Sequence, residues 1–200
     1  MSELYHLVQK RVDKLPTGLQ AHIYRVQDVA RELARFHDMD EDRAALGMLA
    51  HDVARAMPDE ELLRRASDLG LPVGLVEHQV PIVLHGPVGA EVLQQEDGLD
   101  DPSLYGAVYW HTTAHPSLDS LGKLVFLADK LDPQKIVRYP YLPQLKKLAA
   151  EDLDLAMLEF LTRETIARIG RGELIHPLFV ESRNALLAAV KAEGAPASTP

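Results

Sequence analysis

The sequence predicts an all-α protein, a single helical bundle. Apolar residues recur at helical spacing along most of the 200 residues, and no alternation typical of strands is sustained. The apolar run at 80–84 contains Pro81, which disfavours a strand inside a sheet. No heptad repeat is sustained, which argues against a coiled coil. Because 200 residues are enough for one full core, we expect one domain over 1–192 and a disordered tail over 193–200.

Each predicted helix has its own signals. The first long helix carries an apolar face formed by Ile23, Val26, Val29, Ala30, Leu33 and Ala34. Acceptor side chains precede two further helices, Asp40 before the second and Asp101, followed by Pro102, before the fifth. Gly70 closes the third helix, and Pro58 lies just beyond the second. After the first helix, we expect helices over 41–56, 59–69, 87–95, 101–111, 119–131, 152–169 and 177–191.

Composition limits the function classes. The formal net charge is −9, so the chain is a poor candidate for general nucleic-acid binding. No apolar run approaches the ~20 residues that cross a bilayer, and the first residues show no signal-peptide pattern. Cysteine is absent, which excludes disulfides and thiolate chemistry. We therefore expect a cytoplasmic protein that binds neither nucleic acid nor membrane.

His51 and Asp52 stand side by side inside the apolar stretch 44–54. Such a stretch is expected to be buried, and buried polar groups need partners. Imidazole nitrogen and carboxylate oxygen are common ligands of divalent metals. Four more residues lie in or beside apolar segments of other predicted elements: His22, His85, His111 and Asp129.

Each of these six residues also has a structural interpretation. Asp129 can pair with Lys130 or Lys123, His111 can bind a backbone carbonyl, and His85 can cap the helix that follows. Six separate structural roles are a less economical explanation than one site in a bundle, where facing helices supply metal ligands. We therefore expect one metal site, with two metals if Asp52 bridges them.

The ordered motifs resemble a known family. They are the segments at 49–55 (LAHDVAR), 84–90 (LHGPVGA), 111–112 (HT) and 126–133 (FLADKLDP), preceded by His22. Their order is similar to that of the HD-domain metal-dependent phosphohydrolases. More narrowly, the chain resembles the YqeK family of symmetrical diadenosine-tetraphosphate hydrolases, over roughly residues 15–190. The His-Asp pair alone is a weak signal, whereas the second segment at its spacing is more specific.

The resemblance implies a binuclear iron site, and manganese, cobalt or another divalent metal suits the same ligand types. The matching first-metal ligands are His22, His51, Asp52 and Asp129. His85 and His111 match the second-metal ligands, with Asp52 as the bridge. The catalytic roles implied are those of Asp52, His85 and His111, with the ligand and acid roles of the two histidines left open.

The resemblance also implies a nucleotide pocket beside the metals. Its matching residues are Arg55, His85, His111, Thr112, Asp129 and Lys135, and the loop Arg171, Gly172, Glu173, Leu174, Ile175 and His176. Lys135 stands where the family usually has arginine, which keeps the charge but loses the bidentate fork. The loop is nearly as well explained as a plain connector between two helices. The implied reaction cleaves a dinucleoside polyphosphate, diadenosine tetraphosphate, symmetrically to two ADP.

Three other functions compete with this one. The first is an HD phosphohydrolase of another nucleotide, a deoxynucleotide or a guanosine alarmone. The second is a regulator that binds nucleotide without turnover, and the third is a helical adaptor without metal. A homodimer is also open, because Tyr139 and Tyr141 either form a contact between subunits or pack back on the domain.

Overall fold

The computed structural model describes residues 2–193, and all regular structure in that range is helical. This confirms the predicted all-α class. The α-helices are α1 Ser2–Val12, α2 Thr17–Phe36, α3 Glu41–Ala50, α4 Asp59–Asp68, α5 Leu75–Gln79, α6 His85–Asp97, α7 Pro102–Trp110, α8 Ser120–Lys130, α9 Leu142–Glu151, α10 Leu153–Arg171 and α11 Pro177–Glu193. Two short 3-10 helices, η1 Pro81–Leu84 and η2 Pro133–Lys135, precede α6 and follow α8.

Side-chain caps set several helix starts. The Asp40 carboxylate accepts hydrogen bonds from the amides of Asp42 and Arg43 at the start of α3. Asp101 and Asp152 cap α7 and α10 in the same way. These bonds satisfy amide groups that the first turn of a helix leaves without partners. Sequence signals therefore located these starts within a residue or two.

The structure differs from the predicted helices in three respects, of which the third is the end of α3. Three helices were not predicted: α1, α5 and α9. Glu193, expected to begin the tail, is the last residue of α11, and the rest of that tail lies outside the described residues.

The helix expected over 41–56 ends at Ala50, and turns follow it. The His51 ring donates to the carbonyl oxygen of Met48 at 2.6 Å, an oxygen that a continuing helix would pair with the amide of Asp52. Asp52 therefore lies in a turn and not in the helix.

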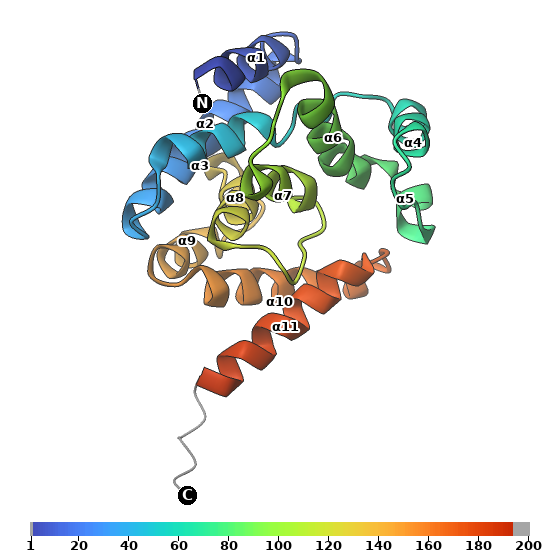
Figure 1. Cartoon of the computed structure of the whole chain (residues 1–200). Helices are drawn as coiled ribbons and strands as arrows, with labels where there is room; N and C mark the ends of the chain where they lie inside the picture. The colour runs from blue at the N-terminus through green and yellow to red at the C-terminus, as the bar shows by residue number, and fades with distance from the viewer. Residues whose placement is uncertain (1, 194–200) are drawn as a thin grey trace, which may run out of the picture.

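The helices pack around one main core and a smaller apolar cluster. α2 packs along α3 and α8, while α7 lies between α6 and α8. The main core includes the fully buried side chains of Ile23, Leu33, Met48, Leu124 and Phe126. The smaller cluster lies between α4 and α6, on the side of the molecule where α4 and α5 project (Figure 1).

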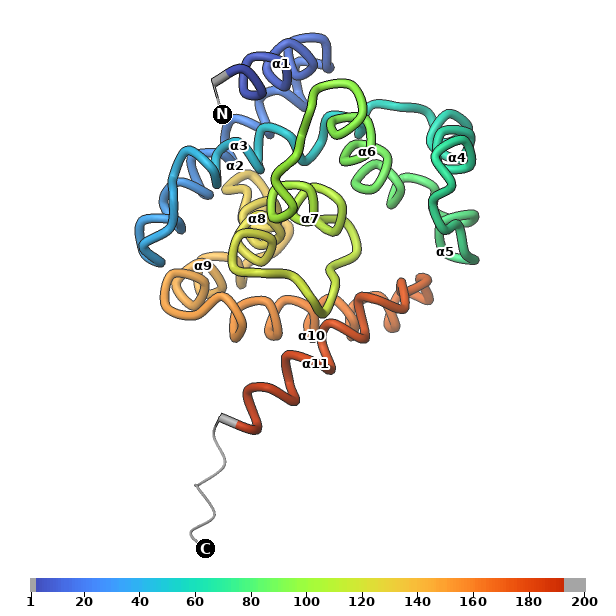
Figure 2. The backbone as a smooth tube through the Cα atoms, viewed as in Figure 1, coloured from blue at the N-terminus to red at the C-terminus, as the bar shows by residue number. Residues whose placement is uncertain are grey.

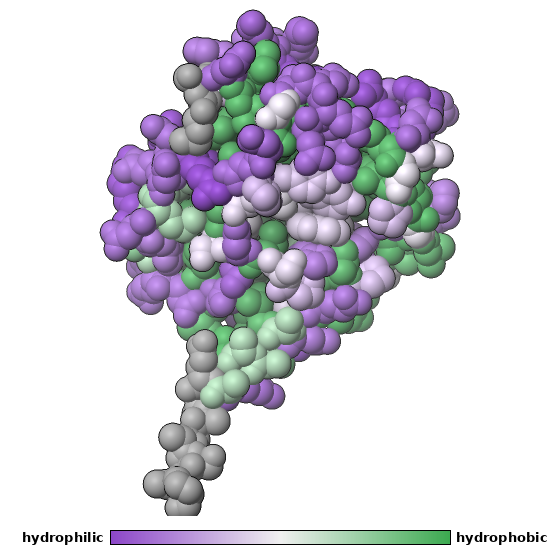
Figure 3. Space-filling model, viewed as in Figure 1, coloured by the Kyte–Doolittle hydropathy of each residue, from purple (hydrophilic) through white to green (hydrophobic). Residues whose placement is uncertain are grey.

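The C-terminal part of the fold is formed by three helices, α9, α10 and α11. α10 packs against α9 and α11 on the side opposite α1, and the C-terminal half of α11 runs away from the body (Figure 2). Hydrophilic side chains cover much of the face around α1, with more apolar ones along α11 (Figure 3). Within the described residues no helix combines the length and apolar character needed to cross a membrane.

Candidate metal centre

Five elements bring the six predicted ligands to one place. His22 lies in the second turn of α2, and His51 and Asp52 follow the last residue of α3. His85 is the first residue of α6, His111 follows α7, and Asp129 lies near the end of α8. Five of these residues are buried, and His22 is nearly so. The six side chains thus form one cluster at the centre of the helical bundle.

Asp52 lies in the middle of this cluster. Its Oδ1 is 2.9 Å from Nε2 of His85 and 3.5 Å from Nε2 of His111. Its Oδ2 is 3.4 Å from Nε2 of His51 and 3.9 Å from Nε2 of His22. The two oxygens of this carboxylate therefore face different histidine pairs.

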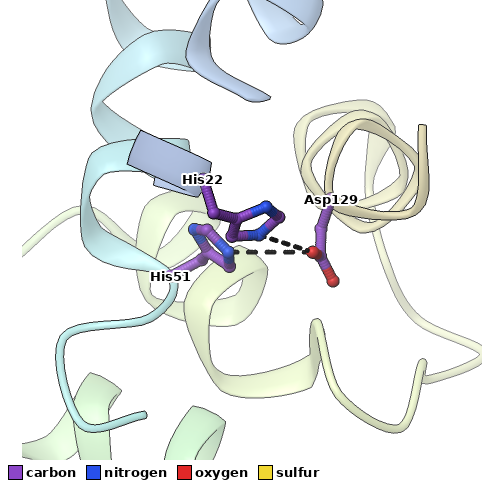
Figure 4. A group of neighbouring side chains, drawn as sticks. All are labelled: His22, His51 and Asp129. Atoms are coloured by element: carbon purple, nitrogen blue, oxygen red, sulfur yellow. Dashed lines mark hydrogen bonds and ion pairs between the residues drawn. The ribbon is translucent and has the colours of Figure 1, made fainter. Parts of the chain in front are cut away.

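Asp129 completes one side of the cluster. Its Oδ1 is 3.1 Å from Nε2 of His22 and 3.9 Å from Nε2 of His51 (Figure 4). These three residues form one group whose ligand atoms lie close enough to share a metal, and His51, Asp52 and His111 form a second. Two lysines also contact the Asp129 carboxylate, Lys130 at Oδ2 and Lys135 at Oδ1.

Three histidines are oriented by the backbone. The Nδ1–H of His51, His85 and His111 donates to the carbonyl oxygen three residues earlier, at 2.6, 2.5 and 2.7 Å respectively. A carbonyl only accepts, so the ring proton of each residue lies on Nδ1. In the neutral form of each ring, Nε2 therefore presents a lone pair to the centre of the cluster, as a metal ligand requires.

The fourth histidine is oriented by a side chain. The Nδ1–H of His22 donates to Oδ2 of Asp132 at 2.7 Å. Arg25 holds the same carboxylate through its Nε at 3.1 Å and its Nη2 at 2.9 Å. No role for Asp132 or Arg25 was predicted from the sequence. The available signal was an aspartate followed by proline, one turn after Asp129.

The donor set fits a metal. Nε2 of His51 is buried and has no hydrogen-bond partner among the described residues. The Nε2 atoms of His85 and His111 lie 2.9 Å apart, although each ring carries its proton on Nδ1. Two lone pairs at this distance, both facing a carboxylate, repel one another unless a cation lies between them. Divalent metals that take nitrogen and oxygen ligands satisfy all these atoms together.

The pKa values show that the cluster needs positive charge at its centre. Burial opposes a charge on His51, but Asp52 and Asp129 outweigh it and raise the pKa of the His51 imidazole. Burial also opposes ionisation of Asp52, but a protonated His51 and hydrogen bonds from the surrounding histidines hold the pKa of the Asp52 carboxyl well below the usual range. A metal bound at the Nε2 atoms would replace that proton and supply the positive charge instead. The same balance, with Lys130 as the main attraction, keeps the pKa of Asp129 low. Burial lowers the pKa of His111 to about 4, so its imidazole is neutral near pH 7.

The cluster lies at the base of a cleft of about 600 Å³. Five of the six ligand candidates, all but His51, line it. Three cationic side chains line it as well: Arg55, Lys130 and Lys135. Thr112 also lines it, and its hydroxyl donates to the carbonyl oxygen of Val83 at 2.8 Å. The wall thus combines acidic ligands at the base with positive charge around them, which suits a polyanion.

A second chamber, of about 280 Å³, adjoins the cleft. The two share Thr112, Lys130 and Lys135, and the chamber is otherwise lined by Arg138, Tyr139, Tyr141, Leu142, Phe160, Glu164, Arg168 and Phe179. Aromatic side chains of this kind stack on nucleobases. The cleft therefore continues into a chamber that is both aromatic and basic.

The loop predicted to close over a base lies away from these two linings. Arg171 pairs with Glu173 at 2.7 Å, and Leu174 is exposed. Ile175 packs against the main core, and Nε2 of His176 donates to Oε1 of Glu77 at 2.7 Å. The loop thus connects α10 to α11 and joins their end to α5. Its role toward a nucleotide stays a prediction.

The amino-acid sequence is similar to a known domain family and to named bacterial proteins. The HD-domain family model matches residues 19–134, more than half of the chain. The chain is 28% identical over 156 residues to the symmetrical bis(5'-nucleosyl)-tetraphosphatase of Bacillus subtilis, covering 78% of this chain and 82% of the relative. It is 27% identical over 166 residues to the protein of the same name from Halalkalibacterium halodurans, covering 83% and 87%.

A solved structure agrees with the fold. The crystal structure of a predicted HD superfamily hydrolase involved in NAD metabolism, from Clostridium acetobutylicum, matches with a TM-score of 0.86. The identity is 27%, and the match covers 92% of this chain and 97% of that one.

Fold and site together define a metal-dependent phosphohydrolase. The chain belongs to the HD-domain family. Its similarity to the symmetrical tetraphosphatases over most of its length confirms the YqeK-type resemblance seen in the motifs.

Proposed function

We propose that this protein hydrolyses diadenosine tetraphosphate symmetrically to two ADP. The observation that carries the proposal is the Asp52 carboxylate, whose two oxygens face two pairs of histidine nitrogens at the base of a cationic cleft. The names of the bacterial relatives support this substrate. Two adjoining cavities offer room for a substrate that has a nucleoside at each end.

The proposed ligands are those of the resemblance. His22, His51, Asp52 and Asp129 would hold one metal, and His85 and His111 the other, with Asp52 shared. Iron is the proposed metal, and manganese or cobalt suits the same donors. Such a metal pair supplies a nucleophile from water near neutral pH and neutralises charge on the phosphoryl oxygens.

The protein's own groups bind and orient the substrate. Arg55, Lys130 and Lys135 would hold the phosphate chain, because these cationic residues line the cleft. Lys130 and Lys135 lie where the cleft meets the aromatic chamber, so phosphates bound there would direct one nucleoside into the chamber. Burial keeps His111 neutral, which favours a ligand role over that of a proton donor.

The reaction balances with water alone. The water oxygen bonds to one of the two central phosphorus atoms, and the bridging oxygen between those two atoms leaves with the other half. Each half is a nucleoside diphosphate, and ADP is a sufficiently weak base to leave without protonation, so the protons of the attacking water pass to the solvent. The Asp52 oxygens lie within 3.9 Å of the Nε2 atoms of all four histidines. Asp52 is therefore suitably placed to orient an attacking water held among them.

Location and assembly complete the proposal. A cysteine-free chain suits the reducing cytoplasm. Tyr139 and Tyr141 are half-buried against the main core, which favours the interpretation in which they pack back on the domain, and the homodimer stays a prediction. Ile166 and Ile169 on α10 are each about two-thirds exposed and are available for such a contact. Light scattering of the protein as it elutes from a size-exclusion column measures the mass of the assembly directly.

Product analysis tests the reaction. The protein, loaded separately with Fe²⁺, Mn²⁺ and Co²⁺, is incubated with diadenosine tetraphosphate, and the products are separated by chromatography. ADP as the sole product is the expected result. AMP with ATP would contradict the point of attack. No turnover of this compound, with turnover of a deoxynucleotide or a guanosine alarmone in the same assay, would favour another HD phosphohydrolase activity.

A further inference from the structure

We propose that Asp132, held by Arg25, is a positioning residue that sets the metal affinity of the His22 side of the cluster. The inference rests on the proposed metal centre but not on the proposed substrate. Neither residue contacts the central atoms of the cluster directly. Their effect passes through the ring of His22, the only one of the four clustered histidines whose Nδ1 is bound by a side chain.

The contrast among the histidines carries the argument. His51, His85 and His111 donate to backbone carbonyls of their own turn, so the local backbone alone orients those three rings. His22 lies inside α2, where the backbone carbonyls are already used by the helix. Its ring is instead fixed by a carboxylate 110 residues away in sequence. A carboxylate acceptor orients a metal-binding imidazole and strengthens it as a ligand.

Asp132 is itself held on every side. Its Oδ2 accepts from Nδ1 of His22 and from Nη2 of Arg25, at 2.7 and 2.9 Å. Its Oδ1 accepts from Nε of Arg25 and from the amide of Gln134, at 3.1 and 2.9 Å. Asp132 is only 2% exposed, so little solvent competes for these bonds.

The same carboxylate links His22 to a cation of the cleft. By accepting from the Gln134 amide, Asp132 caps η2, the short helix that ends at Lys135. Nζ of Lys135 contacts the carbonyl oxygen of Asp129 at 2.8 Å and its Oδ1 at 3.3 Å. One residue therefore positions both a ligand ring and the segment that carries a lysine beside Asp129.

The chain provides a matched control. Asp101 also caps a helix, α7, and is also gripped by one arginine, through Nε and Nη2 of Arg43 at 2.8 and 2.7 Å. It has no bond to a histidine of the cluster. Removing the Asp101 carboxylate thus reproduces the loss of an aspartate–arginine pair and a cap without touching a ligand ring.

The test measures metal binding alone. Full-length wild-type, Asp132→Ala, Asp132→Asn and Asp101→Asn proteins are stripped with a chelator and titrated with Mn²⁺ in competition with an indicator, without nucleotide. We expect Asp132→Ala to weaken one Mn²⁺ site by about 10–100-fold, the range typical of lost outer partners of a ligand. Asp132→Asn keeps an acceptor for the ring and should lose less, and Asp101→Asn should bind as the wild type does.

A second readout separates positioning from folding. The visible absorption of Co²⁺-loaded protein reports the metal's ligand geometry, and we expect Asp132→Asn to change it while helical circular dichroism stays the same. Wild-type affinity and spectrum in both Asp132 variants would overturn the inference, as would an equal loss of affinity in Asp101→Asn. A wild-type protein that binds no metal at all would instead contradict the metal centre itself.

Discussion

At the scale of single residues, the arrangement around Asp52 depends on where protons are. Three ring protons are held on Nδ1 by backbone carbonyls, and that leaves Nε2 atoms facing one another and a carboxylate. Such an arrangement of acceptors is unfavourable without a cation. The buried Nε2 of His51, which has no partner among the described residues, shows this most clearly.

Replacing His51 tests this directly. We expect His51→Ala to lose bound metal and to lower nucleotide hydrolysis by at least about a hundredfold, because the activated water depends on the metals. Elemental analysis and ADP formation measure the two effects. His115→Ala is the control, since that ring stacks on Trp110 outside the cluster. A variant that keeps full metal content and activity would exclude His51 as a ligand.

Arg55 provides a test of phosphate binding. Its exposed side chain lines the cleft and is not a ligand candidate, so Arg55→Met should leave metal content unchanged. We expect the KM for diadenosine tetraphosphate to rise about tenfold with a smaller change in kcat, as for a lost charge-assisted contact. Steady-state kinetics measure this, with the exposed Arg35→Met on α2 as the control. An unchanged KM would remove Arg55 from the phosphate site.

Asp132 also predicts a pH dependence of stability. Burial raises the pKa of Asp132, but the bonds from Arg25 and His22 outweigh it and lower the value from 3.8 to about 2. A carboxyl whose pKa is lower in the folded state stabilises that state above pH 3.8, and the contribution is lost as pH falls toward 2. The full contribution is about 2 kcal/mol, of which about 1 kcal/mol is lost by pH 3.

Urea unfolding in the presence of a chelator measures this contribution. The difference in unfolding free energy between the wild type and Asp132→Asn should be constant near neutral pH and shrink from pH 5 to pH 3. A difference that does not change over that range would show that the carboxyl titrates normally in the folded protein.

At the scale of elements, the site depends on where helices end and how closely they approach. α3 and α7 each stop at a histidine, His51 or His111, whose ring takes the carbonyl that the next helical amide would use. α6 begins at His85 and crosses the end of α7 with no space for a side chain at Gly86. A Cβ on Gly86 would lie 2.7 Å from the carbonyl oxygen of Tyr109 and 3.3 Å from Cε1 of His111.

This close approach predicts a difference between two glycines. Gly86→Ala should push α6 away from α7, cost about 1–3 kcal/mol of stability and weaken metal binding by separating His85 from His111. Gly106→Ala in α7 meets nothing within 4 Å and should be neutral or stabilise by up to about 1 kcal/mol. Thermal unfolding and Mn²⁺ titration measure both. Equal behaviour of the two variants would show that the α6–α7 contact is not needed for the site.

At the scale of the whole molecule, the cluster joins elements that are distant in the chain. Its residues come from α2, α6 and α8 and from the turns after α3 and α7, so a metal bound there connects most of the bundle. The unfolded chain does not hold these residues together. Metal binding is therefore expected to stabilise the fold by mass action.

The expected size of that stabilisation is measurable. With free Mn²⁺ at about 100 times its Kd, binding adds about 2.7 kcal/mol, which corresponds to about 5–10 °C in Tm for a protein of this size. Adding a chelator should reverse the shift, and His51→Ala should show a much smaller one. An identical Tm with and without metal would contradict metal binding by the folded protein.

The sequence alone determined the all-α class and most of the helix positions. These follow from apolar spacing and from local caps such as Asp40 and Asp101, which act within one turn of the chain. Its motifs also led to the family, which the comparisons confirm. Helices α1, α5 and α9 were missed, and the end of α3 was placed six residues too late, because their sequence signals are weak or overridden by a side-chain bond.

Only the tertiary structure decided how the six residues meet and what supports them. The division of the Asp52 oxygens between two histidine pairs depends on the crossing of helices, not on spacing along the chain. The bond from His22 to Asp132 joins positions 110 residues apart, and the aromatic chamber combines the segments around η2, α9, α10 and α11. Local patterns carry no information on such long-range contacts, because packing of the whole bundle fixes them.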